Sequence, residues 1–170
     1  YLIQPLNPFF RYFAQHLAEQ ITRFPFALII AFFFFVFNPE SIWIPNVVIL
    51  FLSIISTFLS FVIQFLIQSI VACLCFWTEK ASSIERMLVI PTYFLSGLLA
   101  PVVSFPDYIK NWIYLTPFPY LIDFPANLIS GNNANISGGL SMQILWILLM
   151  YPLFRKIWYE GTKKYTAMGS

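Results

Sequence analysis

One stretch limits what this chain can fold into: no charged residue occurs between Glu40 and Glu79. An unbroken helix over 47–77 would be roughly 46 Å long at 1.5 Å per residue, which exceeds the ~30 Å hydrocarbon core of a bilayer. Such a helix crosses the membrane with a tilt, or its end extends into the headgroups or the cytosol. We therefore predict a membrane-spanning helix over about 47–77.

The composition of the whole chain agrees with a membrane protein. Of its 170 residues, 59% are hydrophobic and 9% are charged, and the mean hydropathy is +0.77. Soluble domains carry about 25% charged residues, so this chain cannot cover itself with a surface compatible with water. The net charge of +2 and the lack of basic runs interleaved with aromatic residues argue against nucleic-acid binding. We predict a single all-α membrane domain.

Four apolar segments are candidates for crossing the membrane. They lie at about 22–37, 47–77, 84–103 and 140–158. The first is short for a core that takes ~20 residues, so it can borrow apolar residues from the helix before it. The third contains Pro91, and the region of Gly97 and Pro101 is expected to end or kink its helix.

The segment 105–130 is apolar but repeatedly broken. Its two pieces, about 107–115 and 118–130, are too short to cross, and apolar runs of 10–14 residues are typical of re-entrant or interfacial segments. Irregular backbone at membrane depth needs shielding by protein or a water-filled cavity. We predict a re-entrant helical hairpin over about 105–130. The breaks and hinges of this region and of the preceding span are Pro91, Gly97, Pro101, Pro106, Pro117, Pro125 and Gly131.

The segment 5–21 has the pattern of an amphipathic helix. Asn7 and Pro8 suit a helix start, and apolar and polar residues then recur at helical spacings on two faces. A helix resting on the membrane surface fits this pattern, and so does a helix that docks on a soluble partner. The candidates for docking are Phe10, Arg11, Phe13, Gln15 and Leu17.

A polar stripe follows one face of the 47–77 helix, in steps of three or four residues. It consists of Ser53, Ser56, Thr57, Ser60, Gln64 and Gln68. Helix–helix packing is one interpretation, because small hydroxyl and amide groups favour close association in lipid. The wall of a solute path is the other, and both hold if the path runs along a subunit interface. As path candidates we take Ser53, Thr57, Ser60, Gln64, Gln68 and also Asp123.

Groups for catalysis are scarce. His16 is the one histidine, and neither a zinc-protease motif nor an ATP-binding P-loop occurs. Cys73 and Cys75 point to nearly opposite sides of a helix and cannot bridge each other. Asp123 is the acid within the hairpin, and an acid at membrane depth is a functional candidate, although a place among the outer headgroups also suits it. We predict no catalytic residue, metal or cofactor.

The distribution of lysine and arginine predicts the orientation. With four spans, one side carries Arg11, Arg23, Lys80, Arg86, Arg155, Lys156, Lys163 and Lys164, and the other carries Lys110. Both ends of the chain and the loop 76–86 should therefore lie in the cytosol, and the hairpin should face outside.

Short motifs in a fixed order resemble the ABC-2 type permease family over nearly the whole chain. In the middle of the chain they are Phe76-Trp77-Thr78, Leu95-Ser96-Gly97, Pro101, Phe105-Pro106, Pro117-Phe118, Tyr120, Phe124-Pro125-Ala126 and Gly131. At the two ends they are Pro5-Leu6-Asn7-Pro8, Arg11-Tyr12, Trp158, Gly161, Lys164-Tyr165 and Ala167-Met168-Gly169. The chain departs from the family at Ser82-Ser83, where a glycine is common.

The resemblance implies a six-span subunit of the bacterial inner membrane, of which this chain would hold the C-terminal two-thirds. Such subunits pair with a second copy or a paralogue and with a separate ABC ATPase, which binds the ATP. The cytosolic segment that contacts the ATPase corresponds to residues 5–19, and the hairpin corresponds to external re-entrant helices. We predict a permease that exports an amphiphilic or lipid-like compound by alternating access. The alternative is a membrane-embedded lipid-modifying enzyme or assembly factor, for which Asp123 would be essential.

Overall fold

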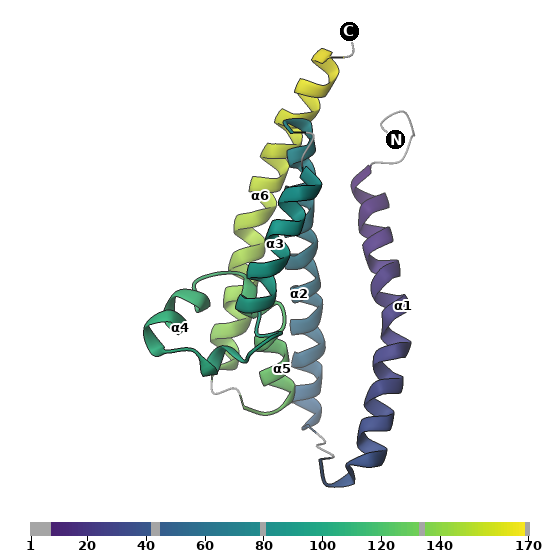
Figure 1. Ribbon diagram of the computed structural model, residues 1–170, viewed down its shortest axis with the longest axis vertical. Coiled ribbons are helices and arrows are strands. Elements are labelled where there is room, and N and C mark those ends of the chain that lie inside the picture. Colours follow the sequence, from purple (N-terminus) through teal and green to yellow (C-terminus); the bar gives the residue numbers. More distant parts are fainter. Residues whose placement is uncertain (1–7, 42–44, 79–80, 133–134, 169–170) are drawn as a thin grey trace. The chain divides into compact units, whose positions relative to one another are not determined.

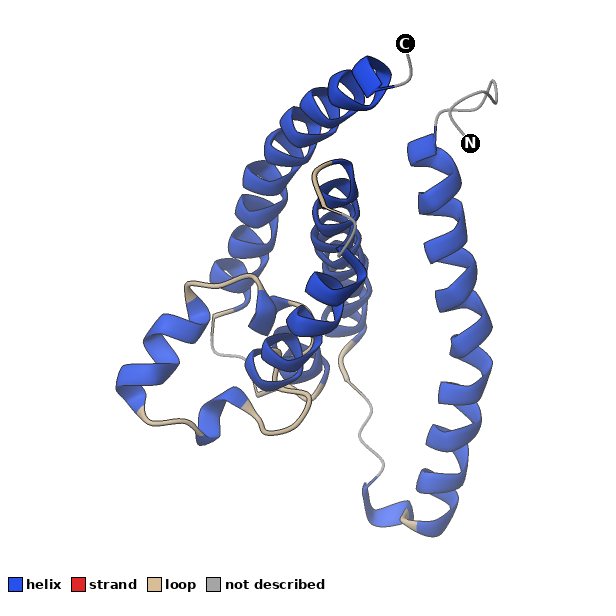
Figure 2. Cartoon of the chain, turned by 45° about the horizontal axis from the view of Figure 1, so that its top comes forward, coloured by secondary structure: helices blue, strands red, loops and turns tan. Residues whose placement is uncertain are grey.

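The computed structural model describes residues 8–41, 45–78, 81–132 and 135–168, and over these residues it contains helices and loops but no strand (Figure 2). This confirms the all-α fold class. The chain divides into two compact units, Tyr1–Ile44 and Pro45–Ser170. Each unit is described by itself.

The first unit is built on one long helix, α1 (Pro8–Phe37), followed by the short 3-10 helix η1 (Pro39–Ser41). The predicted amphipathic segment and the first predicted span are therefore one continuous helix, with Pro25 inside it. An internal proline removes one backbone hydrogen bond, but the helix continues on both sides of Pro25. Asn38 ends the helix, because its amide Nδ2 donates to the Phe34 carbonyl at 3.2 Å and Pro39 cannot continue the turn.

Two long helices form the frame of the second unit and lie side by side (Figure 1). Helix α2 (Val47–Cys73) begins where the Asn46 side chain accepts a hydrogen bond from the Val48 amide at 3.4 Å, and it continues as the 3-10 helix η2 (Leu74–Phe76). These bounds agree with the predicted span 47–77. Helix α6 (Ile136–Met168) extends beyond the predicted 140–158 at both ends, with Pro152 inside it.

The third predicted span, 84–103, is not one helix. Helix α3 (Ala81–Leu95) accommodates Pro91 but stops before Gly97, whose φ is +84°, and the 3-10 helix η3 (Val102–Ser104) follows the turn. The helix ends at the region of Gly97, one of the two outcomes expected there, because a left-handed residue cannot continue a right-handed helix. Among the described residues, three helices are long and apolar enough to cross a membrane, namely Phe10–Phe37, Val47–Phe76 and Ile136–Lys164.

The hairpin segment folds into α4 (Asp107–Tyr114), the 3-10 helix η4 (Phe118–Tyr120) and α5 (Asp123–Ile129). Its two α-helices fall within the pieces predicted at 107–115 and 118–130. Helix α5 lies against α2, whereas α4 stands to the side of the long helices (Figures 1 and 2). The core of the unit joins Ile63 of α2 to Tyr120, Phe124 and Leu128 of the hairpin. The hairpin therefore forms part of the core.

Candidate functional site

A buried glutamine of α6 joins three elements of the second unit. Gln143 is 0% exposed, and its Nε2 lies 3.1 Å from the Ser56 carbonyl oxygen, 3.0 Å from Ser60 Oγ and 3.0 Å from the Tyr120 carbonyl oxygen. Its Oε1 accepts a hydrogen bond from Ser56 Oγ at 3.1 Å. Because an amide nitrogen carries two hydrogens, Gln143 donates to two of these three acceptors at a time. It thereby connects α6 with α2 and with η4.

The Tyr120 carbonyl explains why this cluster forms. Tyr120 is the last residue of η4, and carbonyls at the end of a helix have no partner inside that helix. An unpaired carbonyl in an apolar interior costs several kcal/mol. Ser60 Oγ donates to this carbonyl at 2.7 Å, and Gln143 approaches it from the other side. The side chains of the long helices thus satisfy the broken backbone of the hairpin.

Sequence reasoning missed Gln143. The available signal was its isolation, because it is the one amide in the apolar run 142–154. An isolated amide in such a run tends to find a partner on another helix. Its partners lie 83 to 87 residues away on α2 and 23 residues away on η4, so no local pattern could name them.

The polar stripe of α2 divides lengthwise into a buried half and an accessible half. Ser53, Ser56 and Ser60 are buried. In the other half, Thr57 and Gln68 are exposed and Gln64 is half-buried. Three of the stripe residues therefore lie inside the chain. The accessible half faces away from those contacts.

Asp123 lies inside the chain at the junction between α3 and the hairpin. Its side chain is 6% exposed, and its Oδ1 accepts a hydrogen bond from the Val102 amide at 3.2 Å. Its own amide donates to the Ser96 carbonyl at 2.9 Å. Burial raises the pKa of Asp123, and hydrogen bonds from the Val102 backbone and the Asn127 side chain oppose part of that rise. Both backbone partners flank the turn that follows α3.

Gly97 leaves room for this aspartate. A Cβ at Gly97 would lie 2.8 Å from the Asp123 Cβ, and the positive φ of Gly97 also disfavours any other residue. Gly131, with φ +76°, ends α5 in the same left-handed conformation. Its amide donates to the Leu128 carbonyl at 3.2 Å, and the Asn132 amide donates to the Asn127 carbonyl at 3.1 Å. This is the Schellman pattern.

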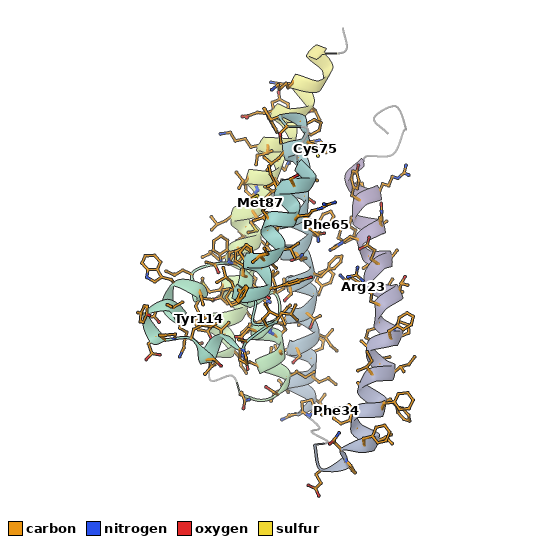
Figure 3. The ribbon with its side chains drawn as sticks, viewed as in Figure 1. Arg23, Phe34, Phe65, Cys75, Met87 and Tyr114 are labelled. Carbon is orange, nitrogen blue, oxygen red and sulfur yellow. The ribbon has the colours of Figure 1, made fainter. Side chains whose placement is uncertain are left out.

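Further contacts join residues that are far apart in sequence. The Phe76 ring packs against Gly161, where a Cβ would overlap it, and its centroid lies 5.8 Å from that of Trp158. The Phe124 ring packs against Gly139 of α6 in the same way. Within the hairpin, the hydroxyl of Tyr120 donates to the carbonyl of Tyr114, labelled in Figure 3, at 2.9 Å. The hairpin is therefore fixed to α6, and within it η4 is fixed to α4.

The docking candidates all lie in the first three turns of α1, in the first unit. Phe10 is 65% exposed, Leu17 is exposed and Phe13 is half-buried. Arg11 and Gln15 are exposed on the same helix. At 100° per residue, the three apolar side chains share one face. This face could be read from the sequence alone.

In the described part of the chain, no three His, Cys, Asp or Glu residues gather as metal ligands would. Both cysteines have free thiols; Cys73 is buried and Cys75 is exposed.

Comparison with known families gives one match, which covers residues 1–169. The matching family model is described as ABC-2 family transporter protein. Neither a curated protein nor a solved structure gives a significant match. The match includes every element described above, from α1 to α6. The chain therefore belongs to the ABC-2 transporter family, and it is a multi-pass membrane component of such a transporter.

Proposed function

We propose that this chain is a permease subunit that exports an amphiphilic or lipid-like compound by alternating access, driven by a separate ABC ATPase. The family match over residues 1–169 is the observation that carries the proposal. Three apolar helices of membrane-spanning length support it. Asp123, on which a lipid-modifying enzyme would depend, has its carboxylate engaged by the Val102 amide, so we do not propose the enzyme alternative.

The proposed topology has four crossings, with both ends in the cytosol of a bacterial inner membrane and the hairpin outside. The count of basic residues supports this orientation, because eight of the nine lysines and arginines then lie on the cytosolic side. The third crossing would consist of α3 and the turn and 3-10 helix after it. The hairpin would enter the outer leaflet, where its contacts with α2 and α6 shield its broken backbone.

The ATPase would dock on the segment 5–21. A continuous α1 supports this proposal, because 30 residues form a rod about 45 Å long. A displacement of its docking end would therefore reach the spanning part without being absorbed at a break. Phe10, Phe13 and Leu17 would contact the ATPase on their shared face, and Arg11 and Gln15 would flank them.

The solute path would follow the accessible half of the α2 stripe. Thr57, Gln64 and Gln68 can face a second permease copy or a paralogue, whereas Ser53, Ser60 and Asp123 are engaged inside the chain. A path along a subunit interface would combine the two original interpretations of the stripe. Its polar groups would meet the headgroup of an amphiphile while lipid-like tails remain among apolar residues.

Purification of the whole permease from membranes tests the proposal. We expect an ATP-binding partner to accompany it, and we expect that partner to hydrolyse ATP faster in the complex than alone. Recovery of the permease without any such partner, from the cells in which it is naturally made, would refute the proposed function.

The docking segment is tested by Phe10→Ala combined with Phe13→Ala. The double variant should lower the stimulation of ATP hydrolysis severalfold, because an alanine pair removes most of the apolar contact. The matched control is Phe34→Ala, an exposed phenylalanine on the same helix outside the docking segment (Figure 3). Equal stimulation by the double variant and the control would remove the docking assignment.

A further inference from the structure

Helix α3 is enclosed most tightly where it ends. Among the side chains of α3 that the structure describes, none is buried, and Met87 is 73% exposed (Figure 3). The half-buried side chains lie along one face, namely Ile84, Leu88, Pro91, Thr92 and Leu95. Ser96, directly after the helix, is 0% exposed. The body of the helix therefore packs only through half-buried side chains, whereas the residue that follows it is enclosed by the rest of the unit.

Asp123 makes the hydrogen bonds that close this end. Its amide donates to the Ser96 carbonyl, and its carboxylate accepts from the Val102 amide. These two groups lie on either side of the turn 96–102, so one residue of α5 holds both ends of the turn. Gly97 lies between them with its Cα against the Asp123 side chain, where no larger residue fits.

The helix that carries Asp123 is itself fixed to the two long helices. Phe124 and Leu128 of α5 belong to the core that contains Ile63 of α2. Gly139 of α6 lets the Phe124 ring approach its backbone. Asp123 is therefore the connection between a weakly packed helix and a rigid frame.

We propose that Asp123 and Gly97 form a joint about which α3 tilts during transport, and that Asp123 is a positioning residue of the transport cycle. The joint acts through hydrogen-bond acceptance at Oδ1, so a neutral carbonyl oxygen at that position serves as well as a carboxylate oxygen. The hairpin end of α3 stays fixed while the opposite end moves. The role of the joint in transport rests on the proposed function, whereas the geometry of the joint does not.

The test compares Asp123→Asn with Asp123→Ala in the whole permease bound to its ATPase. Asparagine keeps an acceptor for the Val102 amide and alanine removes it. Asp107→Ala is the control, because Asp107 is an exposed acid of the same hairpin that forms an ion pair with Lys110. Nitroxide labels at Met87 of α3 and Leu149 of α6, both exposed, report the distance between the two helices by pulsed electron paramagnetic resonance.

We expect alanine to broaden the Met87–Leu149 distance distribution and to speed hydrogen exchange of the Val102 amide roughly tenfold, the factor expected for one lost hydrogen bond. Asparagine and the control should leave both unchanged. If Asp123→Ala does not insert into membranes, Gly97→Ala disturbs the joint from the other side and should broaden the same distribution.

Two results would overturn the joint. One is an unchanged distance distribution in the alanine variant. The other is loss of ATPase stimulation in Asp123→Asn while the Val102 amide stays protected, since the charge rather than the acceptor would then matter. The distance and exchange measurements need no transported compound, so failure of the joint can be told apart from failure of the proposed function.

Discussion

Replacement of Gln143 by leucine gives the sharpest test of how the hairpin is held. Leucine has a similar volume but neither donates nor accepts a hydrogen bond. The wild-type amide can donate two hydrogen bonds and accepts one from Ser56. Side-chain hydrogen bonds in a membrane protein contribute ~0.6 kcal/mol each on average, so three give about 2 kcal/mol. We expect Gln143→Leu to lower the free energy of unfolding by that amount.

The loss stays moderate because Ser60 remains. Its hydroxyl still donates to the Tyr120 carbonyl at 2.7 Å, so the hairpin backbone is not left without a partner. Replacing Ser60 by alanine in the Gln143→Leu background should therefore cost more than Ser60→Ala alone. A double-mutant cycle measures this difference, which should be on the order of 1 kcal/mol because an unpaired buried carbonyl costs about 1–3 kcal/mol.

The assay measures reversible unfolding of the whole permease, either by steric trapping in bicelles or by denaturation in mixed micelles. Gln68→Leu is the matched control, because it makes the same chemical change on an exposed position of α2. The control should change the free energy of unfolding by less than about 0.5 kcal/mol. Equal effects of the two substitutions would refute the reasoning that Gln143 is held by its buried partners.

Two further predictions concern packing and accessibility. Gly139→Ala should destabilise the protein by about 1–3 kcal/mol in the same assay, because the added methyl group overlaps the buried Phe124 ring. Gly138→Ala should cost less, since its added methyl meets the exposed side chain of Asn135, which can move; equal costs would contradict this packing. A maleimide should label Cys75 faster than Cys73, because Cys73 is buried and Cys75 is exposed. Mass spectrometry of the two peptides measures the two labelling rates, and faster labelling of Cys73 would mean that the helix is rotated from the orientation described here.

The helix bounds that could be predicted are those with local causes. Helix α2 begins after the Asn46 cap, and no proline, glycine or charge interrupts the sequence before residue 77. Helix α4 also follows from Pro106 and Pro117 on either side of it, whereas α5 contains Pro125 and ends before the left-handed Gly131. The end of α3 also has a local cause, because Gly97 adopts a left-handed conformation and stops the helix at Leu95.

The helix bounds that could not be predicted depend on contacts with distant residues, or on a helix continuing through a change in its surface pattern. Helix α6 persists past 158 because Trp158 and Gly161 pack on Phe76, a partner more than 80 residues earlier in the chain. In α1, the change from amphipathic to apolar sequence suggested two segments, but a change of surface pattern does not itself break a helix. We expected Asp123 to be functional because it carries a charge. In the structure, its carboxylate and its amide instead form hydrogen bonds with backbone groups of Val102 and Ser96.

The partners of the Tyr120 carbonyl also bear on how the protein is made. During synthesis, Ser60 leaves the ribosome before the hairpin does, whereas Gln143 leaves after it. Until α6 enters the membrane, the hairpin has one of its two side-chain anchors and lacks the surface on which Phe124 rests. The hairpin therefore completes its folding only when the last helix is in place, which makes membrane insertion of α6 the step that commits the hairpin to its final structure.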